Sequence, residues 1–103
     1  MSISVRIPQI TDHLYAIELF YRKTELSTGD IRDLFRKEDG TRIGSGRALR
    51  LKELAREAQR ETKAPIYDPQ SVNTEIAYKT WGIDIHKLER RYKKLREYAE
   101  VTS

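Results

Sequence analysis

The chain contains no cysteine and has few prolines, glycines, phenylalanines, tryptophans and histidines. Its 103 residues include three Pro, five Gly, two Phe, one Trp and two His. The lack of cysteine excludes a disulfide scaffold, a thiol nucleophile and a Cys-based zinc site. His13 and His86 lie far apart in the sequence, so we expect neither a His-rich metal site nor a bound cofactor.

Long apolar runs are also missing. No stretch approaches the ~18 consecutive apolar residues that span a bilayer, and no charged and then apolar leader opens the chain. We therefore expect a soluble, cytoplasmic protein with no membrane partner. A length of 103 residues suits one domain with a small core.

Charged residues are plentiful, and the excess of positive charge is concentrated in two segments. The chain carries 20 Lys and Arg against 16 Asp and Glu. Residues 42–63 hold seven basic and three acidic residues, and residues 84–103 hold six and four. Basic segments of this kind are typical of surfaces that bind phosphates. A solvated helix face is the alternative, because Glu53, Glu57 and Glu61 recur among the basic residues at helical spacing.

Apolar spacing and capping residues predict an all-α domain of about five helices. Helices are expected at about 11–22, 28–37, 45–62, 74–81 and 85–99, after the capping residues Thr11 or Asp12, Ser27, Ser45, Asn73 or Thr74, and Asp84. Alternating apolar and polar residues over 3–7 add a short N-terminal strand, which Pro8 ends.

The first four helices each have an apolar face that we expect to be buried. These faces comprise Leu14, Ile17, Phe20 and Tyr21; Ile31, Leu34 and Phe35; Ala48, Leu51, Leu54, Ala55 and Ala58; and Val72, Ile76, Ala77, Tyr78 and Trp81. Trp81 is expected to anchor the joint between the last two helices.

Residues 26–58, LSTGDIRDLFRKEDGTRIGSGRALRLKELAREA, place a short capped helix, a turn and a basic helix in succession. The first of these helices carries Ser27, Asp30, Ile31, Leu34 and Phe35, and the second carries Ser45, Ala48 and Leu51. This pattern resembles the helix-turn-helix of small bacterial and phage DNA-binding proteins. It implies that the two helices pack at a large angle and that the second, at about 45–60, enters a major groove of ~12 Å width.

The predicted elements divide the single domain into three parts, and the resemblance assigns roles to individual residues. Residues 1–10 form an N-terminal arm, 11–62 the helix-turn-helix with its supporting helix, and 63–103 a C-terminal helical pair. The residues expected to contact bases are Ser45, Gly46, Arg47 and Arg50, with Glu53 at the edge of the set. Those expected to contact phosphates are Thr28 and Arg42, with Lys52 and Arg56 flanking them. Residues 36–44 exceed the usual turn, so this loop either reaches the DNA backbone or joins an ordinary helical hairpin.

The C-terminal helix has two interpretations. Arg90, Arg91, Lys93 and Lys94 suit a second phosphate-binding face. The stripe formed by Ile85, Leu88, Tyr92, Leu95 and Ala99 packs equally well on its own domain or on a second copy of the chain, which would make a homodimer.

The sequence thus predicts sequence-specific binding of double-stranded DNA, by a small transcriptional regulator or an accessory factor of a mobile element. The rival is a protein-interaction module in which residues 85–99 pair with another chain. RNA binding by a basic helical face is a third interpretation. We do not expect an enzyme, because the sequence has no nucleophile paired with a base and no Gly-rich phosphate loop.

Overall fold

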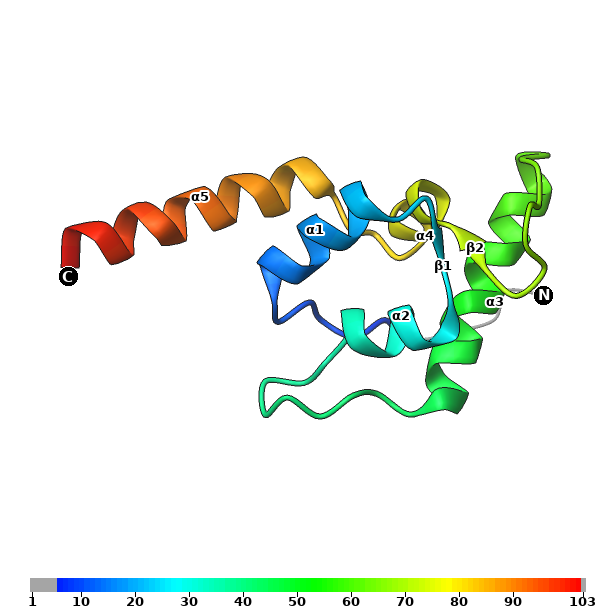
Figure 1. Cartoon of the computed structure of the whole chain (residues 1–103), viewed down its shortest axis with the longest axis horizontal. Helices are drawn as coiled ribbons and strands as arrows, with labels where there is room; N and C mark the ends of the chain where they lie inside the picture. The colour runs from blue at the N-terminus through cyan, green and yellow to red at the C-terminus, as the bar shows by residue number, and fades with distance from the viewer. Residues whose placement is uncertain (1–5, 103) are drawn as a thin grey trace.

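The computed structural model describes residues 6–102, which form five helices and a small two-stranded sheet (Figure 1). The elements in chain order are α1 (His13–Arg22), β1 (Glu25–Leu26), α2 (Thr28–Leu34), α3 (Ser45–Glu61), β2 (Val72–Asn73), α4 (Thr74–Thr80) and α5 (Ile85–Thr102). The predicted all-α fold with about five helices is therefore confirmed. Of the strand predicted at 3–7, residues 3–5 lie outside the described residues, and Arg6 and Ile7 belong to no strand.

Local side-chain caps begin most of the helices where the sequence predicts. Asp12 accepts from the Tyr15 N–H at the start of α1. Ser27 and Asp30 cap each other's main chain in a capping box at α2. The Asn73 side chain accepts from the Ile76 N–H at α4, and the Asp84 carboxylate accepts from the His86 and Lys87 N–H groups at α5. The predicted Ser45 cap is wrong, because Gly44 is the N-cap of α3 and Ser45 is its first helical residue.

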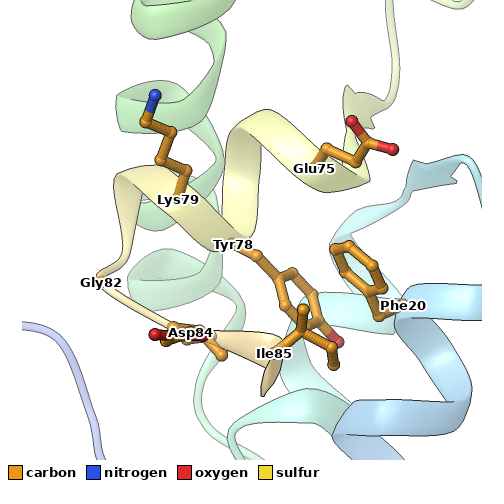
Figure 2. A pocket seen from close by; sticks show the side chains of 8 residues that line it. Phe20, Glu75, Tyr78, Lys79, Gly82, Asp84 and Ile85 are labelled. Carbon is orange, nitrogen blue, oxygen red and sulfur yellow. The ribbon is translucent and has the colours of Figure 1, made fainter. Parts of the chain in front are cut away.

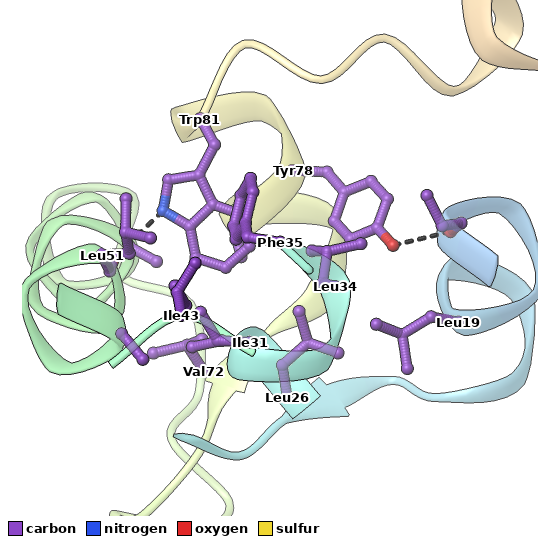
Figure 3. Packing of buried hydrophobic residues seen from close by; sticks show 14 residues of the cluster. Leu19, Leu26, Ile31, Leu34, Phe35, Ile43, Leu51, Val72, Tyr78 and Trp81 are labelled. Atoms are coloured by element: carbon purple, nitrogen blue, oxygen red, sulfur yellow. Dashed lines mark hydrogen bonds between the residues drawn. The ribbon is translucent and has the colours of Figure 1, made fainter. Parts of the chain in front are cut away.

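The core joins α2, α3 and α4 around Trp81 (Figure 3). The indole Nε1 donates to the Leu51 main-chain oxygen over 2.9 Å, and the Phe35 ring meets the indole edge-on at 5.4 Å. The predicted core residues of α2 and the first half of α3 are all buried: Ile31, Leu34, Phe35, Ala48 and Leu51. Burial of this face fixes α3 against α2 and turns the opposite side of α3 to solvent.

The sheet was not predicted, and it links two distant parts of the chain. Glu25 lies opposite Asn73 and Leu26 opposite Val72 in an antiparallel pair. The Thr74 hydroxyl extends this contact by donating to the Lys23 oxygen over 2.7 Å. Strands of two residues are too short to carry an alternating pattern, so sequence periodicity cannot reveal them.

Helix α1 buries a different face from the predicted one. Ala16 and Leu19 are its buried residues, whereas Leu14 and Tyr21 are 41% and 63% exposed. The Ala16 main-chain oxygen accepts a 2.6 Å hydrogen bond from the Tyr78 hydroxyl of α4. The predicted stripe instead lies toward α5, where the Tyr21 hydroxyl donates to Glu89.

Helix α5 packs on the rest of the fold mainly through its first half. Ile85, Leu88 and Tyr92 are half-buried, whereas Leu95 and Ala99 of the same predicted stripe are exposed. In Figure 1 the second half of α5 extends away from the other elements and makes the molecule elongated, with extents of 48 × 25 × 24 Å.

Candidate nucleic-acid interface

The connection between α2 and α3 is held against α2 by its own side chains. Arg32 Nε donates to the Ile43 oxygen over 2.9 Å, and Ile43 itself is buried. Arg42 donates to the Gly29 oxygen and forms an ion pair with Asp33, in which Nε lies 2.8 Å from Oδ1. In Figure 1 α3 crosses near the N-terminal end of α2 instead of running alongside it.

The four residues expected to contact bases all lie exposed on the first two turns of α3. They are Ser45, Gly46, Arg47 and Arg50. No acidic residue lies in the first turn, whereas Glu53 and Glu57 occupy the exposed face further along. At the N-terminal end of α3, Arg47 and Arg50 are therefore exposed with no acidic residue in the first turn, whereas Arg60 and Lys63 at the other end lie near Glu57 and Glu61 in the sequence.

Gly44 and Gly46 place no side chain over the N-terminal end of α3. An added Cβ at Gly44 or at Gly46 would meet no atom within 4 Å, and neither residue has a positive φ. Packing inside the protein therefore does not require glycine at either position. Glycine also lets another molecule approach the helix backbone closely.

The structure brings two of the expected phosphate-binding residues together. Lys52 Nζ donates to the Thr28 hydroxyl over 3.0 Å and to the Gln70 oxygen over 3.3 Å. Both residues are half-buried, so they lie at the junction of α2, α3 and the segment before β2. Arg42 is shared between the α2 backbone and Asp33, which offsets its charge locally.

Arg56 has a structural role that the sequence did not reveal. Its side chain is 7% exposed. Its Nη2 donates to the main-chain oxygens of Asp68, Pro69 and Ser71. The predicted phosphate contact requires an accessible guanidinium, so we leave Arg56 out of the interface. Helical spacing alone placed it on a solvent flank, because the segment that covers it follows α3 in the chain.

Gln59 is a second buried polar residue that the sequence analysis missed. Its Nε2 donates to the Pro65 oxygen, and its Oε1 accepts from the Asn73 N–H. The available signal was its position, four residues after Ala55 on the inner stripe of α3. Together, Arg56 and Gln59 hold residues 63–71 against α3 and leave Tyr67 81% exposed.

The remaining expected phosphate contacts lie on α5, separate from the α3 set. Arg90, Arg91 and Lys94 are all exposed. Figure 1 places α5 and α3 on opposite sides of α1 and α2. The structure therefore contains two basic surfaces, and the sequence alone did not show how they are related.

The hollow in Figure 2 lies between α1, α4 and the start of α5. It encloses about 440 Å³ between Phe20, Tyr78 and Ile85, with Glu75 and Lys79 at its rim. Burial raises the pKa of the Tyr78 hydroxyl, which remains protonated as a donor to Ala16. Tyr78 therefore acts as a structural group.

Within residues 6–102 no cluster of three or more His, Asp or Glu side chains is arranged to hold a metal ion.

None of the helices in the described part of the chain has the length and apolar character needed to cross a bilayer. No protein-family model, curated protein or solved structure matches the chain. Any functional assignment must therefore come from the residues and their geometry.

Proposed function

We propose that the chain binds double-stranded DNA through the first two turns of α3, as a small sequence-specific regulator or mobile-element accessory factor. One observation carries the proposal. The N-terminal end of α3 exposes Ser45, Gly46, Arg47 and Arg50, and its first turn contains no acidic residue. Recognition helices of the helix-turn-helix class contact base edges with their N-terminal residues. Because Ala48 and Leu51 are buried in the core, the opposite side of this end of α3 faces solvent.

The chemistry of these side chains supports base recognition. The guanidinium fork of arginine donates two hydrogen bonds to O6 and N7 of guanine. The bare start of α3 at Gly44 and Gly46 permits close approach of a phosphate to the first helical N–H groups. Lys52 and Thr28, which are bonded to each other at the α2–α3 junction, would contact the adjoining backbone.

Fluorescence anisotropy with a labelled random duplex at two salt concentrations tests the proposal. We expect binding at low salt that weakens as salt rises, because released counterions drive contact with phosphates. The variant Arg47→Gln/Arg50→Gln should bind more weakly than the parent. A control variant, Arg60→Gln/Lys63→Gln, removes two exposed cations at the other end of α3. The proposal fails if the parent shows no binding at low salt, or if both variants behave alike.

A protein-interaction role is the second candidate, and the end of α5 favours it. Leu95, Tyr98 and Val101 are 58%, 68% and 84% exposed. Light scattering over a range of concentrations would detect self-association, and Leu95→Glu should abolish it. A double-stranded RNA competitor in the anisotropy assay separates DNA binding from RNA binding.

A further inference from the structure

The two flanks of α5 differ in charge. Residues three, four and seven apart share one face of a helix, and Lys87, Arg90, Arg91 and Lys94 have this spacing. All four are exposed, and we call them the α5 basic stripe. Glu89 and Glu100 fall on the other flank, beside Lys93 and Arg96. Glu97 lies three residues after Lys94 and seven after Arg90, at the edge of the basic stripe.

Each flank of α5 faces a different part of the fold. Glu89 accepts a hydrogen bond from the Tyr21 hydroxyl of α1 over 2.5 Å, so the acidic flank lies toward α1. Lys87 and Arg91 instead line a hollow of about 370 Å³ with Pro8 and Ile10. The α5 basic stripe therefore borders the N-terminal segment, residues 6–10.

The same N-terminal segment reaches the start of α3. Arg47 Nη2 donates to the Arg6 main-chain oxygen over 3.3 Å. In Figure 1 the segment passes α2 on its way toward the lower part of α3. From Arg6 to Ile10 an extended chain covers at most about 14 Å, which equals about four base pairs at 3.4 Å each. Arg47 and the α5 basic stripe thus lie at the two ends of one short segment.

The charge along this path is almost entirely positive. Residues 6–10 contribute Arg6 and no acidic residue. Asp84 is the carboxylate that lines the hollow, and its Oδ1 accepts from the His86 and Lys87 N–H groups at the start of α5. A polyanion lying across the segment would meet cations at both ends.

We infer that the α5 basic stripe binds the phosphate backbone of the same duplex whose groove the start of α3 reads. This inference rests on the proposed function and adds the direction of the duplex, which runs from α3 across residues 6–10 to α5. The stripe contacts only phosphates. It therefore strengthens binding to every sequence and does not alter which sequence is preferred.

Two variants of identical composition test the inference. Arg91→Gln/Lys94→Gln removes one Arg and one Lys from the basic stripe, and Lys93→Gln/Arg96→Gln removes the same pair from the other flank of α5. On a 20-base-pair duplex, the stripe variant should reduce the slope of log K against log salt by about 2, since each lost phosphate contact removes about 0.9. The matched variant should leave the slope close to that of the parent. Thermal unfolding followed by circular dichroism verifies that both variants fold.

Combining the variants separates the possible outcomes. If both surfaces hold one duplex, the slope reductions of Arg47→Gln/Arg50→Gln and Arg91→Gln/Lys94→Gln add, and only the former pair alters sequence preference. Equal slopes for the two α5 variants, or reductions that do not add, would overturn the inference and leave the proposed function intact. If instead Arg47→Gln/Arg50→Gln binds as the parent does, the proposed function itself fails.

Discussion

The Arg56 guanidinium and the Ser71 main-chain oxygen are hydrogen-bonded inside the fold, although Arg56 belongs to the most basic segment of the sequence. Two neighbouring carbonyls, those of Asp68 and Pro69, accept from the same nitrogen. One cation of the basic segment thus stabilises the fold and is not offered to a ligand. Residues that look equivalent in the sequence should therefore respond differently to substitution.

Arg56→Gln should lower the free energy of unfolding by about 2–3 kcal/mol, because the buried Ser71 carbonyl and the part-buried carbonyls of Asp68 and Pro69 lose hydrogen bonds from a charged donor. Urea unfolding measures this loss. The exposed Arg60→Gln on the same helix serves as the control and should change stability by less than about 0.5 kcal/mol. At temperatures where Arg56→Gln is folded, its DNA affinity should match that of the parent. A stable variant with weakened DNA binding would contradict the assignment.

Arg47→Ala and Arg50→Ala should each weaken binding to a selected duplex by about 1–3 kcal/mol and reduce the preference over random DNA. Lys52→Gln should instead weaken binding to selected and random duplexes equally, because a phosphate contact carries no sequence information. Selection from randomised DNA followed by anisotropy supplies both measurements. If the arginine variants keep the full preference of the parent, the base-reading assignment is wrong.

Gly46→Ala separates stability from binding. Alanine at this exposed helical position should raise the free energy of unfolding by up to about 1 kcal/mol, since its Cβ meets no neighbour. The same methyl group should weaken DNA binding by blocking close approach to the helix start. Unfolding and anisotropy experiments on one preparation test both effects. An alanine variant that binds as tightly as the parent would show that the duplex does not approach this residue.

Trp81→Ala should lower the free energy of unfolding by about 3–5 kcal/mol, as expected for loss of a large core aromatic. Trp81→Phe should cost less, because it keeps a ring beside Phe35 and loses mainly the hydrogen bond to Leu51. Denaturant unfolding ranks the two variants. Equal losses would mean that the hydrogen bond, and not the packing, dominates the contribution of Trp81.

Asp30 makes stability depend on pH in the acid range. Partial burial disfavours its charge, but hydrogen bonds from Ser27 and Lys23 outweigh that effect and lower its pKa. A lowered pKa means that the carboxylate contributes stability above its ordinary value of 3.8, and that this contribution disappears as pH falls through the folded-state pKa.

The variant Asp30→Asn tests this dependence. The difference in unfolding free energy between parent and variant should be largest near neutral pH and should shrink below about pH 4. Urea unfolding at several pH values measures the difference, with the exposed Glu57→Gln as the control. A difference that stays constant with pH would show that the Asp30 charge does not support the capping box.

Much of the structure of residues 26–51 was predictable, because its signals are local. Ser27 and Asp30 are three residues apart, so their reciprocal capping is visible in the sequence. The spacing of Ile31, Leu34 and Phe35 likewise identified a face that is buried. The Ser45 cap was misplaced by one residue, since a serine and an adjacent glycine both suit the N-cap position.

The face that α1 buries was not predictable in the same way. Leu14 and Tyr21 have the spacing of a buried stripe, yet Ala16 and Leu19 lie in the core. A helix with apolar residues around much of its circumference has several candidate faces, and the helix packed against it decides among them. Here Ala16 and Leu19 join the core, where the Tyr78 hydroxyl donates to the Ala16 oxygen, and Tyr21 lies toward Glu89 of α5.

The sequence by itself determined where most helices begin, which residues of α2 and of the first half of α3 pack together, and how much positive charge the chain carries. These features depend on neighbours within one or two helical turns. Only the tertiary structure decided that Arg56 is internal, that residues 25–26 pair with 72–73, and that residues 6–10 connect Arg47 to the basic stripe of α5. The reason is physical: burial and electrostatic environment depend on distant segments that fold over a residue, and no local spacing records them.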